Sequence, residues 1–355
     1  MAKQKLVMIG NGMAGLRTIE EILERSDSQF DITIIGKEPY PNYNRIMLSN
    51  ILQKKMTVEE TIMNDYDWYK EHHIELIVDD PVEKVDRQSK TVTTSKGITV
   101  AYDICIFATG SKAFVLPIPG SELPSVIGWR TIEDTERMIE IAKTKKRAIV
   151  IGGGLLGLEC ARGLMDQGMD VTVLHLAEWL MEMQLDRKAG DMLKADLERQ
   201  GMHIELQANS KEIIGTDDVE AIKLADGRVI ETDLVVMAVG IRPFTEVARE
   251  AGLEVNRGIV VNDYLQTSDE HIYAVGECAE HNGKVYGLVA PLYEQGKVLA
   301  DYLTGKETEG YKGSTTFMSL KVSGCDLYSA GQIVEDETVH GIEIFNSVDN
   351  IYKKV

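Results

Sequence analysis

Two glycine-rich segments have the spacing that binding of a dinucleotide requires. Gly10-Asn11-Gly12-Met13-Ala14-Gly15 and Gly152-Gly153-Gly154-Leu155-Leu156-Gly157 both fit the pattern G-x-G-x-x-G. In this pattern the first glycine permits a tight turn, the second lets a pyrophosphate approach backbone amides, and the third lets a helix pack against a strand. One such match often marks only a structural turn. Two matches in one chain predict two dinucleotide sites, and therefore redox chemistry between them.

The elements expected around the two segments repeat in the same order. Each glycine segment follows a short apolar strand and opens a helical pattern that leads to a second strand. The strands, helix and second strand expected are 5–9, 13–25 and 31–35 in the first copy, and 147–151, 155–167 and 170–174 in the second. Each copy closes on a buried-strand pattern that ends at glycine, over 102–110 and 233–240. The fold class predicted is α/β, with two Rossmann-like units on parallel sheets.

The acid that binds a ribose is expected about 20 residues beyond each glycine turn, near the end of the second strand. Glu38 is the nearest acid in the first copy, although it follows Gly36-Lys37 and is otherwise explained as a solvated turn residue. The second copy carries His175 at this place, either as a binding residue or as an ordinary strand-end histidine. Without an acid a 2′-phosphate is not repelled, so the sequence leaves both NADH and NADPH open.

Composition excludes several classes of partner. The 355 residues include 57 acidic and 38 basic ones, and the net charge of −19 disfavours nucleic acid and anionic lipid. No apolar stretch approaches the roughly 18 residues of a membrane helix, and no signal peptide is recognisable, so a cytoplasmic location is expected. The four cysteines are far apart and form neither a C-x-x-C pair nor a zinc spacing, so no metal site is predicted: Cys105, Cys160, Cys278 and Cys325.

The order of motifs along residues 3–310 resembles that of the FAD/NAD-linked pyridine nucleotide reductases. The motifs are the two glycine segments, Ala108-Thr109-Gly110, Glu159 after the second turn, Ala238-Val239-Gly240-Ile241-Arg242-Pro243 and Ile272-Tyr273-Ala274-Val275-Gly276-Glu277. The resemblance implies an NAD(P)-binding domain, 116–242, inserted into a split FAD-binding domain, 1–115 and 243–310. The remaining residues, 311–355, are expected to form a partial, truncated, β-rich piece of a C-terminal α+β domain.

The same resemblance implies which residues contact the cofactors. Gly276 and Glu277 correspond to positions at the FAD pyrophosphate and ribityl chain, although Glu277 replaces the usual Asp. The helix near Pro291 would point its positive end at the flavin, which stabilises negative charge there. Arg45 and Arg130 match arginines that contact FAD, and Glu159 matches a glutamate near the flavin and nicotinamide rings. The alternative without a cofactor is that Arg45 and Arg130 are ordinary surface arginines and that Glu159 only interacts with the dipole of its helix. The other predicted contacts are Val82, Thr109, Gly110 and Gly240.

The positions of the cysteines restrict where electrons go after the flavin. No cysteine precedes Cys105, whereas disulfide reductases and peroxidase-like members of the family need cysteine beside the flavin. Electrons must therefore reach an acceptor elsewhere, and no general base is assigned because the cofactors carry the chemistry.

Five segments resemble the large subunits of assimilatory NAD(P)H nitrite reductases: Pro41-Asn42-Tyr43-Asn44-Arg45, 152–159, 273–278, 288–295 and 320–324. This resemblance implies transfer from NAD(P)H through FAD to iron–sulfur and sirohaem centres in a missing remainder of a longer protein, or to a small subunit. Homodimers are common in the family. Two other interpretations stay open: a stand-alone NAD(P)H reductase for rubredoxin or ferredoxin, and a redox-sensing flavoprotein without turnover.

Overall fold

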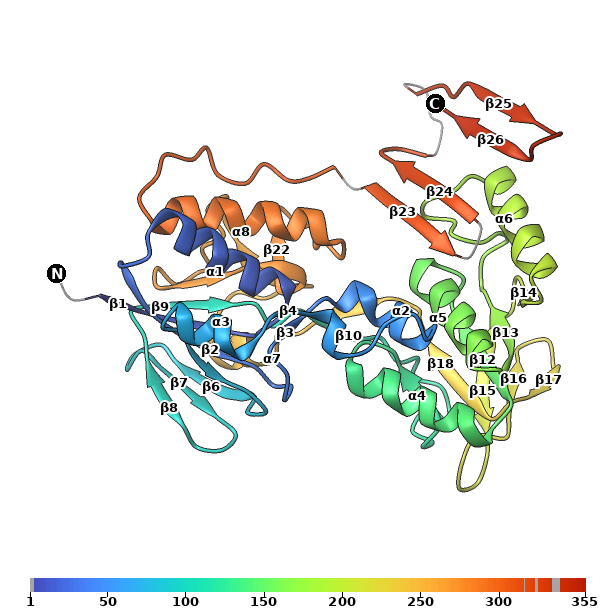
Figure 1. The fold of residues 1–355 in the computed structure, drawn as a ribbon, viewed down its shortest axis with the longest axis horizontal. Helices are drawn as coiled ribbons and strands as arrows, with labels where there is room; N and C mark the ends of the chain where they lie inside the picture. Colours follow the sequence, from blue (N-terminus) through green and yellow to red (C-terminus); the bar gives the residue numbers. More distant parts are fainter. Residues whose placement is uncertain (1–2, 316, 323–324, 334–338) are drawn as a thin grey trace. The chain divides into compact units, whose positions relative to one another are not determined.

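Each glycine turn follows a strand of its own parallel β-sheet in the computed structural model (Figure 1). The structure describes residues 3–315, 317–322, 325–333 and 339–355. The chain divides into two compact units. Unit 1 comprises Met1–Met47, Thr57–Lys112 and Ile241–Ser314, and unit 2 comprises Leu48–Met56, Ala113–Gly240 and Thr315–Val355. The predicted α/β class, with one Rossmann-like unit inserted into another, is confirmed.

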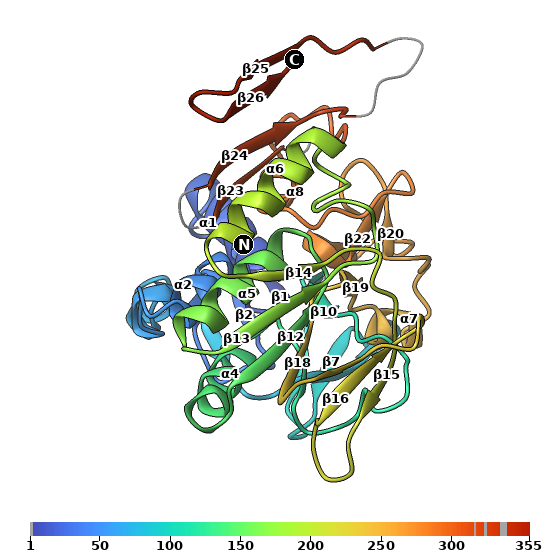
Figure 2. The ribbon, with the colours of Figure 1, turned by 90° about the vertical axis from the view of Figure 1, so that its right-hand side faces the viewer.

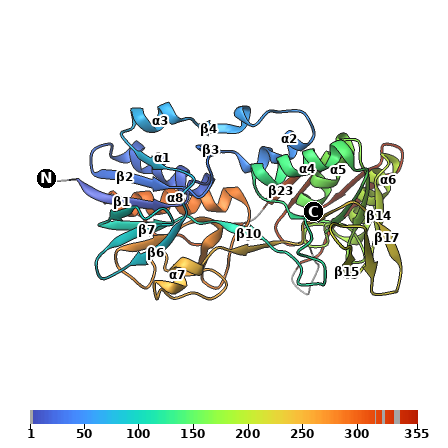
Figure 3. The same ribbon diagram turned by 90° about the horizontal axis from the view of Figure 1, so that it is seen from below.

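Unit 1 is built on a five-stranded parallel sheet in the order β21-β9-β1-β2-β5. Helices α1 and α8 pack together on one face of this sheet, and the antiparallel sheet β6-β7-β8 lies on the other (Figures 1 and 3). The elements of the sheet and its helices are β1 (Gln4–Ile9), α1 (Met13–Arg25), β2 (Phe30–Ile35), β5 (Glu75–Ile77), β6 (Val82–Asp86), β7 (Thr91–Thr94), β8 (Thr99–Ala101), β9 (Ile104–Phe107), β21 (Ile272–Ala274) and α8 (Val289–Leu303). The shorter elements are β3 (Asn42–Tyr43), η1 (Arg45–Met47), η2 (Glu59–Thr61), β4 (Ile62–Asn64), α3 (Tyr66–Glu71), β10 (Ser111–Ala113), β19 (Ile241–Pro243), α7 (Glu246–Glu250), β20 (Ile259–Val261), η3 (Gly276–Cys278) and β22 (Ala279–His281).

The core of unit 1 explains why these segments fold as they do. Strand β9 and the last four residues of β1 are apolar and buried because both faces of a parallel sheet are covered. Helix α1 buries only one stripe, including Leu16, Ile19 and Ile22, and its outer face is polar. Because the strands of this sheet are parallel, their carboxyl ends lie along one edge, and the glycine turn lies at that edge.

Unit 2 repeats the arrangement with the sheet order β11-β18-β12-β13-β14. Strand β12 lies between β18 and β13, as β1 lies between β9 and β2, and α5 packs on β12 and β13 (Figure 2). The elements are α2 (Leu48–Leu52), β11 (Val126–Gly128), α4 (Ile132–Thr144), β12 (Arg147–Ile151), α5 (Leu155–Asp166), β13 (Asp170–Leu174), α6 (Arg187–Arg199), β14 (His203–Glu205), β15 (Ser210–Ile214), β16 (Ala221–Leu224), β17 (Val229–Glu231), β18 (Leu234–Met237), β23 (Phe317–Val322), β24 (Cys325–Ala330), β25 (Glu343–Asn346) and β26 (Ile351–Lys354).

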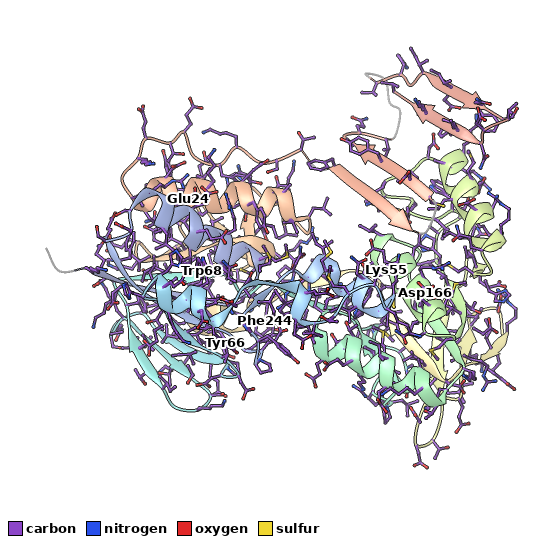
Figure 4. The ribbon with its side chains drawn as sticks, viewed as in Figure 1. Glu24, Lys55, Tyr66, Trp68, Asp166 and Phe244 are labelled. Carbon is purple, nitrogen blue, oxygen red and sulfur yellow. The ribbon has the colours of Figure 1, made fainter. Side chains whose placement is uncertain are left out.

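Unit 2 contains two segments besides residues 113–240, namely 48–56 and 315–355. Residues 48–56, which we expected in the FAD-binding domain, cluster with unit 2 because α2 packs on α4 and α5. Gln167, just after α5, donates from Nε2 to the carbonyl oxygen of Leu52 at 2.7 Å, and a Cβ on Gly163 would meet the Leu52 side chain. Lys55 and Asp166, labelled in Figure 4, come from these two neighbouring segments.

The C-terminal residues, which we expected to form a partial further domain, make up the second of these segments. Residues 315–355 cluster with unit 2. Tyr352 on β26 donates to the carboxylate of Asp186 at 2.6 Å, which ties the last hairpin to the start of α6. Positions 316, 323–324 and 334–338 of the predicted C-terminal piece lie outside the described residues. Among the described residues, no helix is both long and apolar enough to cross a bilayer.

Candidate functional site

The first glycine turn, between β1 and α1, is closed on one side and open on the other. Gly10 has a φ of +114°, and a Cβ there would lie 2.2 Å from the carbonyl oxygen of Ala108. A Cβ on Gly15 would lie 2.8 Å from the Ala108 side chain. Gly12, at the N-cap of α1, has no described atom within 4 Å of its Cβ position apart from its chain neighbours. Close packing therefore accounts for Gly10 and Gly15 but not for Gly12.

The second turn, between β12 and α5, has the same asymmetry. Gly152 has a φ of +119°, and its Cβ would lie 2.3 Å from the carbonyl oxygen of Ala238. A Cβ on Gly157 would lie 1.9 Å from the carbonyl oxygen of Gly152. Gly154 is open like Gly12, with no described neighbour within 4 Å. The two turns are thus copies of one device, as the repeated sequence predicts.

These turns fit the pyrophosphate of a dinucleotide. Helices α1 and α5 have 13 and 12 residues, and neither N-terminus has a side-chain cap. The first amides of a helix have no partner within the helix, and its dipole favours negative charge there. Gly12 and Gly154 leave these amides open to a phosphate group. FAD at the first turn and NAD(P)H at the second are therefore chemically compatible with the residues present.

The predicted residues that flank the second turn gather at the same sheet edge. Leu155 and Leu156 form the first turn of α5, and Leu156 is exposed. Gly240 follows β18 with a φ of +104°, and a Cβ there would have no described neighbour within 4 Å. Strand β18 pairs with β12, so Gly240 and Leu155 both follow adjacent parallel strands. Their positions suit a ligand that lies across the carboxyl edge.

Gly276 closes the first site from the far end of the chain. It follows β21 with a φ of +88°, and a Cβ on it would lie 3.0 Å from the Ala14 side chain. Its amide donates to Oε1 of the buried Gln295 on α8 at 2.8 Å. Met13 and Ala14 are the first residues of α1, and Pro291 lies buried in the first turn of α8. The structure therefore brings the first and last predicted FAD motifs into contact.

Glu277 lies in a buried polar pair beside this turn. It is 8% exposed and accepts a hydrogen bond from Oγ of Ser111 at 2.7 Å. A Cβ on Gly110, whose φ is +64°, would lie 3.9 Å from Oε2 of Glu277. Thr109 donates from Oγ1 to the carbonyl oxygen of Phe244 at 2.6 Å; Figure 4 labels Phe244. Three predicted site residues, Thr109, Gly110 and Glu277, thus meet at the ends of β9 and β21.

Glu38 and Arg45, predicted separately, form an ion pair. Arg45 Nη2 lies 2.5 Å from Oε1 of Glu38, and the hydroxyl of Tyr43 donates to Oε2 of Glu38 at 2.7 Å. Burial raises the pKa of Glu38, but the charge of Arg45 and the two hydrogen bonds outweigh it and leave this pKa lowered. The pKa of Arg45 is raised because the nearby Tyr43 and Glu38 outweigh desolvation. Glu38 is therefore a carboxylate at neutral pH, but it is held by Arg45 rather than solvated.

Two buried residues that support the first glycine turn were not predicted. Tyr69 on α3 donates from its hydroxyl to Oδ1 of Asn11 at 2.8 Å and accepts from the amide of Asn42 at 3.2 Å. The side chain of Asn42 donates to the carbonyl oxygen of Asn11 at 3.0 Å. Asn11 is a variable position of the glycine motif, and Tyr69 lies 58 residues further along the chain, so no local pattern links the two. Burial raises the pKa of Tyr69 to about 12, so its hydroxyl stays protonated.

Two other predicted contacts lie apart from the turns. Val82 is half-buried on β6 and packs against the core of unit 1. Arg130 belongs to unit 2, where its amide donates to Oδ2 of Asp134 at 2.8 Å beside the capping box of α4. Neither position is tied to a glycine turn by these interactions.

At the end of β13, His175 links the second glycine turn to an acid from a later loop. Nδ1 of His175 lies 3.0 Å from the amide of Gly153, and Nε2 lies 2.9 Å from Oε2 of Glu182. A carboxylate seven residues further on, in the loop between β13 and α6, therefore lies beside the residue that ends the strand. A search limited to the strand end could not find it, because the loop returns to the strand only in the folded chain.

Glu159 faces α2 within unit 2. Burial raises the pKa of Glu159 to about 7, and a hydrogen bond with Ser49 offsets only part of this effect. Ser49 lies on α2 and is buried. Near neutral pH this carboxyl group is therefore divided between its protonated and ionised forms.

The cysteines are all described, and all are free. Cys105, Cys160 and Cys278 are buried, and burial raises the pKa of each thiol. Each thiol therefore stays protonated, which suits packing residues better than nucleophiles. No group of three or more potential metal ligands occurs in the part of the chain that the structure describes.

The comparisons with known proteins agree with this geometry. The chain is 54% identical over 355 residues to NAD(P)H nitrite reductase of Bacillus subtilis strain 168, which covers 100% of this chain and 44% of that protein. It is 48% identical over 354 residues to the assimilatory nitrate reductase electron transfer subunit of the same strain, which covers 100% of this chain and 46% of that protein. The chain thus spans less than half the length of these relatives.

A solved structure extends the agreement to three dimensions. The ferredoxin reductase of Rhodopseudomonas palustris matches with a TM-score of 0.90 at 26% identity, over 99% of this chain and 88% of that one. Residues 4–296 match the family described as pyridine nucleotide-disulphide oxidoreductase. The resemblance that the order of motifs indicates is therefore confirmed, and the chain belongs to the pyridine nucleotide-disulphide oxidoreductase family.

Proposed function

We propose that this chain is the electron-entry module of an assimilatory nitrite reductase, which takes electrons from NAD(P)H through FAD to a metal centre. The observation that carries the proposal is the pair of matching glycine turns, each closed by packing at its first and third glycines and open at its second. When bound, FAD accepts a hydride from NAD(P)H and releases electrons singly. The protein would hold the two cofactors in position and supply charge near them.

The first turn is assigned to FAD because the later motifs of the chain return to it. Gly276 lies against Ala14, and Glu277 lies beside Gly110. We assign to FAD binding Gly10, Gly12, Met13, Ala14, Gly15, Glu38, Arg45, Val82, Thr109, Gly110, Arg130, Gly276, Glu277 and Pro291. The amides of α1 would hold its pyrophosphate, and the start of α8 would favour negative charge on its ring system.

The second turn is assigned to NAD(P)H because it repeats the first within the inserted unit. We assign to this site Gly152, Gly154, Leu155, Leu156, Gly157, Glu159, His175 and Gly240. The domain limits of 1–115 and 243–310 for FAD and 116–242 for NAD(P)H remain part of the proposal, as does a cytoplasmic location. The acceptor would be an iron–sulfur or sirohaem centre on further domains or on a partner subunit, and the protein could act as a homodimer.

Anaerobic reduction tests the proposal directly. The purified chain should hold one FAD, and NADH or NADPH should bleach the yellow absorbance of the flavin in the absence of oxygen. A chain that holds FAD which dithionite bleaches, but which neither nicotinamide nucleotide bleaches, would contradict it.

A stand-alone reductase for a small electron carrier is the second candidate. It is supported by the match to the R. palustris ferredoxin reductase, because that match covers 88% of the solved chain. Reduction of ferredoxin or rubredoxin by the chain alone, at an ordinary enzymatic rate, would favour this candidate. Steady-state reduction of ferricyanide by NAD(P)H would exclude a redox sensor without turnover.

A further inference from the structure

The loop between β13 and α6 folds back onto the second glycine turn. The amide of Met181 donates to the carbonyl oxygen of Gly153 at 3.1 Å. A Cβ on Gly153 would lie 2.6 Å from the Leu180 side chain and 2.8 Å from the ring of His175. The loop is therefore held against the turn by a hydrogen bond and by close packing, and Glu182 follows directly.

The hydrogen bonds of His175 define which of its nitrogens carries the proton. A backbone amide can only donate, so Nδ1, which lies 3.0 Å from the amide of Gly153, is the acceptor. Nε2 then carries the hydrogen and donates it to Oε2 of Glu182 at 2.9 Å. His175 is 7% exposed, whereas the Glu182 side chain is 36% exposed. Glu182 is thus oriented by a buried ring while part of its carboxylate stays accessible.

We propose that Glu182 receives the adenosine ribose hydroxyls at the second site and thereby selects NADH over NADPH. This inference rests on the proposed function. The end of the second strand of a dinucleotide-binding unit is where an acid accepts hydrogen bonds from the ribose. Here His175 occupies that position, and its hydrogen bond brings the carboxylate of Glu182 to the same edge. A 2′-phosphate would meet this negative charge, whereas a 2′-hydroxyl would donate to it.

The neighbouring cations do not neutralise this carboxylate. Arg187 pairs with Glu178 at 2.8 Å, and Lys188 pairs with Glu343 at 3.4 Å. Within the described ranges of the chain, no lysine or arginine forms an ion pair with Glu182, whose partner is His175. A 2′-phosphate would therefore meet a carboxylate whose charge no paired arginine offsets.

Binding of the oxidised nucleotides tests the inference without any electron transfer. Calorimetry of the FAD-loaded chain with NAD⁺ and NADP⁺ should give tighter binding of NAD⁺. Glu182→Gln should reduce the ratio of the two affinities by about tenfold, because a hydrogen bond to a charged group contributes about that factor. Glu182→Arg should shift the preference toward NADP⁺. Glu178→Gln, on the same loop but paired with Arg187, is the matched control and should leave the ratio unchanged.

The outcomes separate the inference from the proposed function. Equal affinities for NAD⁺ and NADP⁺ in the parent chain, or an unchanged ratio in both Glu182 variants, would overturn the role of Glu182 alone. A parent chain that holds FAD but binds neither nucleotide would overturn the proposed function. FAD content and circular dichroism of each variant establish that the fold is retained, and the Glu182→Arg variant gives a second reading, which should change the ratio in the same direction as Glu182→Gln but further.

Discussion

Gly276 and Ala14 lie in contact although they belong to the last and the first predicted FAD motifs in the sequence. A Cβ on Gly276 would lie 3.0 Å from that of Ala14, at a backbone φ of +88°. The contact places the last predicted FAD motif against the first turn of α1. A change that disturbs this contact should therefore change the affinity of the chain for FAD.

Replacement of Gly276 by Ala should weaken FAD binding more than it weakens the fold. The substitution strains the backbone by about 1–3 kcal/mol and also displaces Ala14. Gly305→Ala is the matched control, because Gly305 has a φ of +73° and no described neighbour within 4 Å. Both variants should lower the melting temperature by a few degrees, but only Gly276→Ala should raise the FAD dissociation constant, by about tenfold. Equal FAD affinities in the two variants would refute the assignment.

Substitutions at the two open glycines should separate the two nucleotide sites. Gly12 and Gly154 have ordinary extended backbones, with φ of −87° and −85°, and no described neighbours, so valine should fit without disturbing the fold. Gly12→Val should be purified without FAD. Gly154→Val should retain FAD that dithionite bleaches and NAD(P)H does not. The measurements are flavin absorbance and anaerobic reduction, and the opposite pattern would exchange the two assignments.

Glu159→Gln should stabilise the protein at alkaline pH but not in acid. The folded pKa of Glu159 is raised from 4.5 to about 7, so the native state holds a proton that the unfolded chain releases. The stability associated with this group is present below pH 4.5 and is lost as the pH rises through about 7. At pH 8 the variant should therefore gain on the order of 2 kcal/mol over the parent chain.

Chemical unfolding of the FAD-free chain at pH 4.5 and pH 8 checks this prediction. Glu140→Gln is the control, because Glu140 is exposed on α4 and pairs with Lys143. A Glu159→Gln effect that is the same at both pH values would show that Glu159 titrates normally in the folded protein.

Tyr69→Phe should weaken FAD binding by loosening the first glycine turn. Loss of the hydroxyl leaves the buried Asn42 amide and Asn11 side chain without this partner, at a cost of about 1–3 kcal/mol. Tyr102→Phe is the control, since Tyr102 is also buried in unit 1 and no bond from its hydroxyl to the turn occurs among the described residues. Denaturant unfolding and FAD titration measure both effects. If Tyr69→Phe binds FAD as tightly as the parent chain, the turn does not depend on this hydroxyl.

Local patterns were sufficient to predict the framework of both units. The sequence predicts a helix over 13–25 and strands over 147–151 and 170–174, and α1, β12 and β13 have these same bounds. Glycine turns, apolar strands and amphipathic helices depend on neighbouring residues, so a short window of sequence contains their signal. The close approach of Gly10 to the backbone of Ala108 could be predicted only from the repeat. In both copies, the residue after the closing strand lies against the first glycine of the turn.

The residues that escaped prediction are joined by contacts between distant segments. Ser49 reaches Glu159 because α2 packs on α5, and Tyr69 reaches Asn11 because α3 lies beside the first turn. Glu182 reaches the end of β13 because its loop reverses direction. None of these side chains belongs to a recognisable sequence motif. Only the packing of distant segments in the folded chain brings each one to its partner.

The insertion of one unit into the other has a consequence for synthesis on the ribosome. The parallel sheet of unit 2 has all its strands once β18, ending at Met237, has emerged. The sheet of unit 1 starts with the first strand of the chain but must wait for β21 at Ile272–Ala274, and its face for α8 at Val289–Leu303. Domains form as units during translation. The nascent polypeptide therefore completes the parallel sheet of unit 2 while that of unit 1 still lacks its edge strand β21, so the sheet that begins first is completed last.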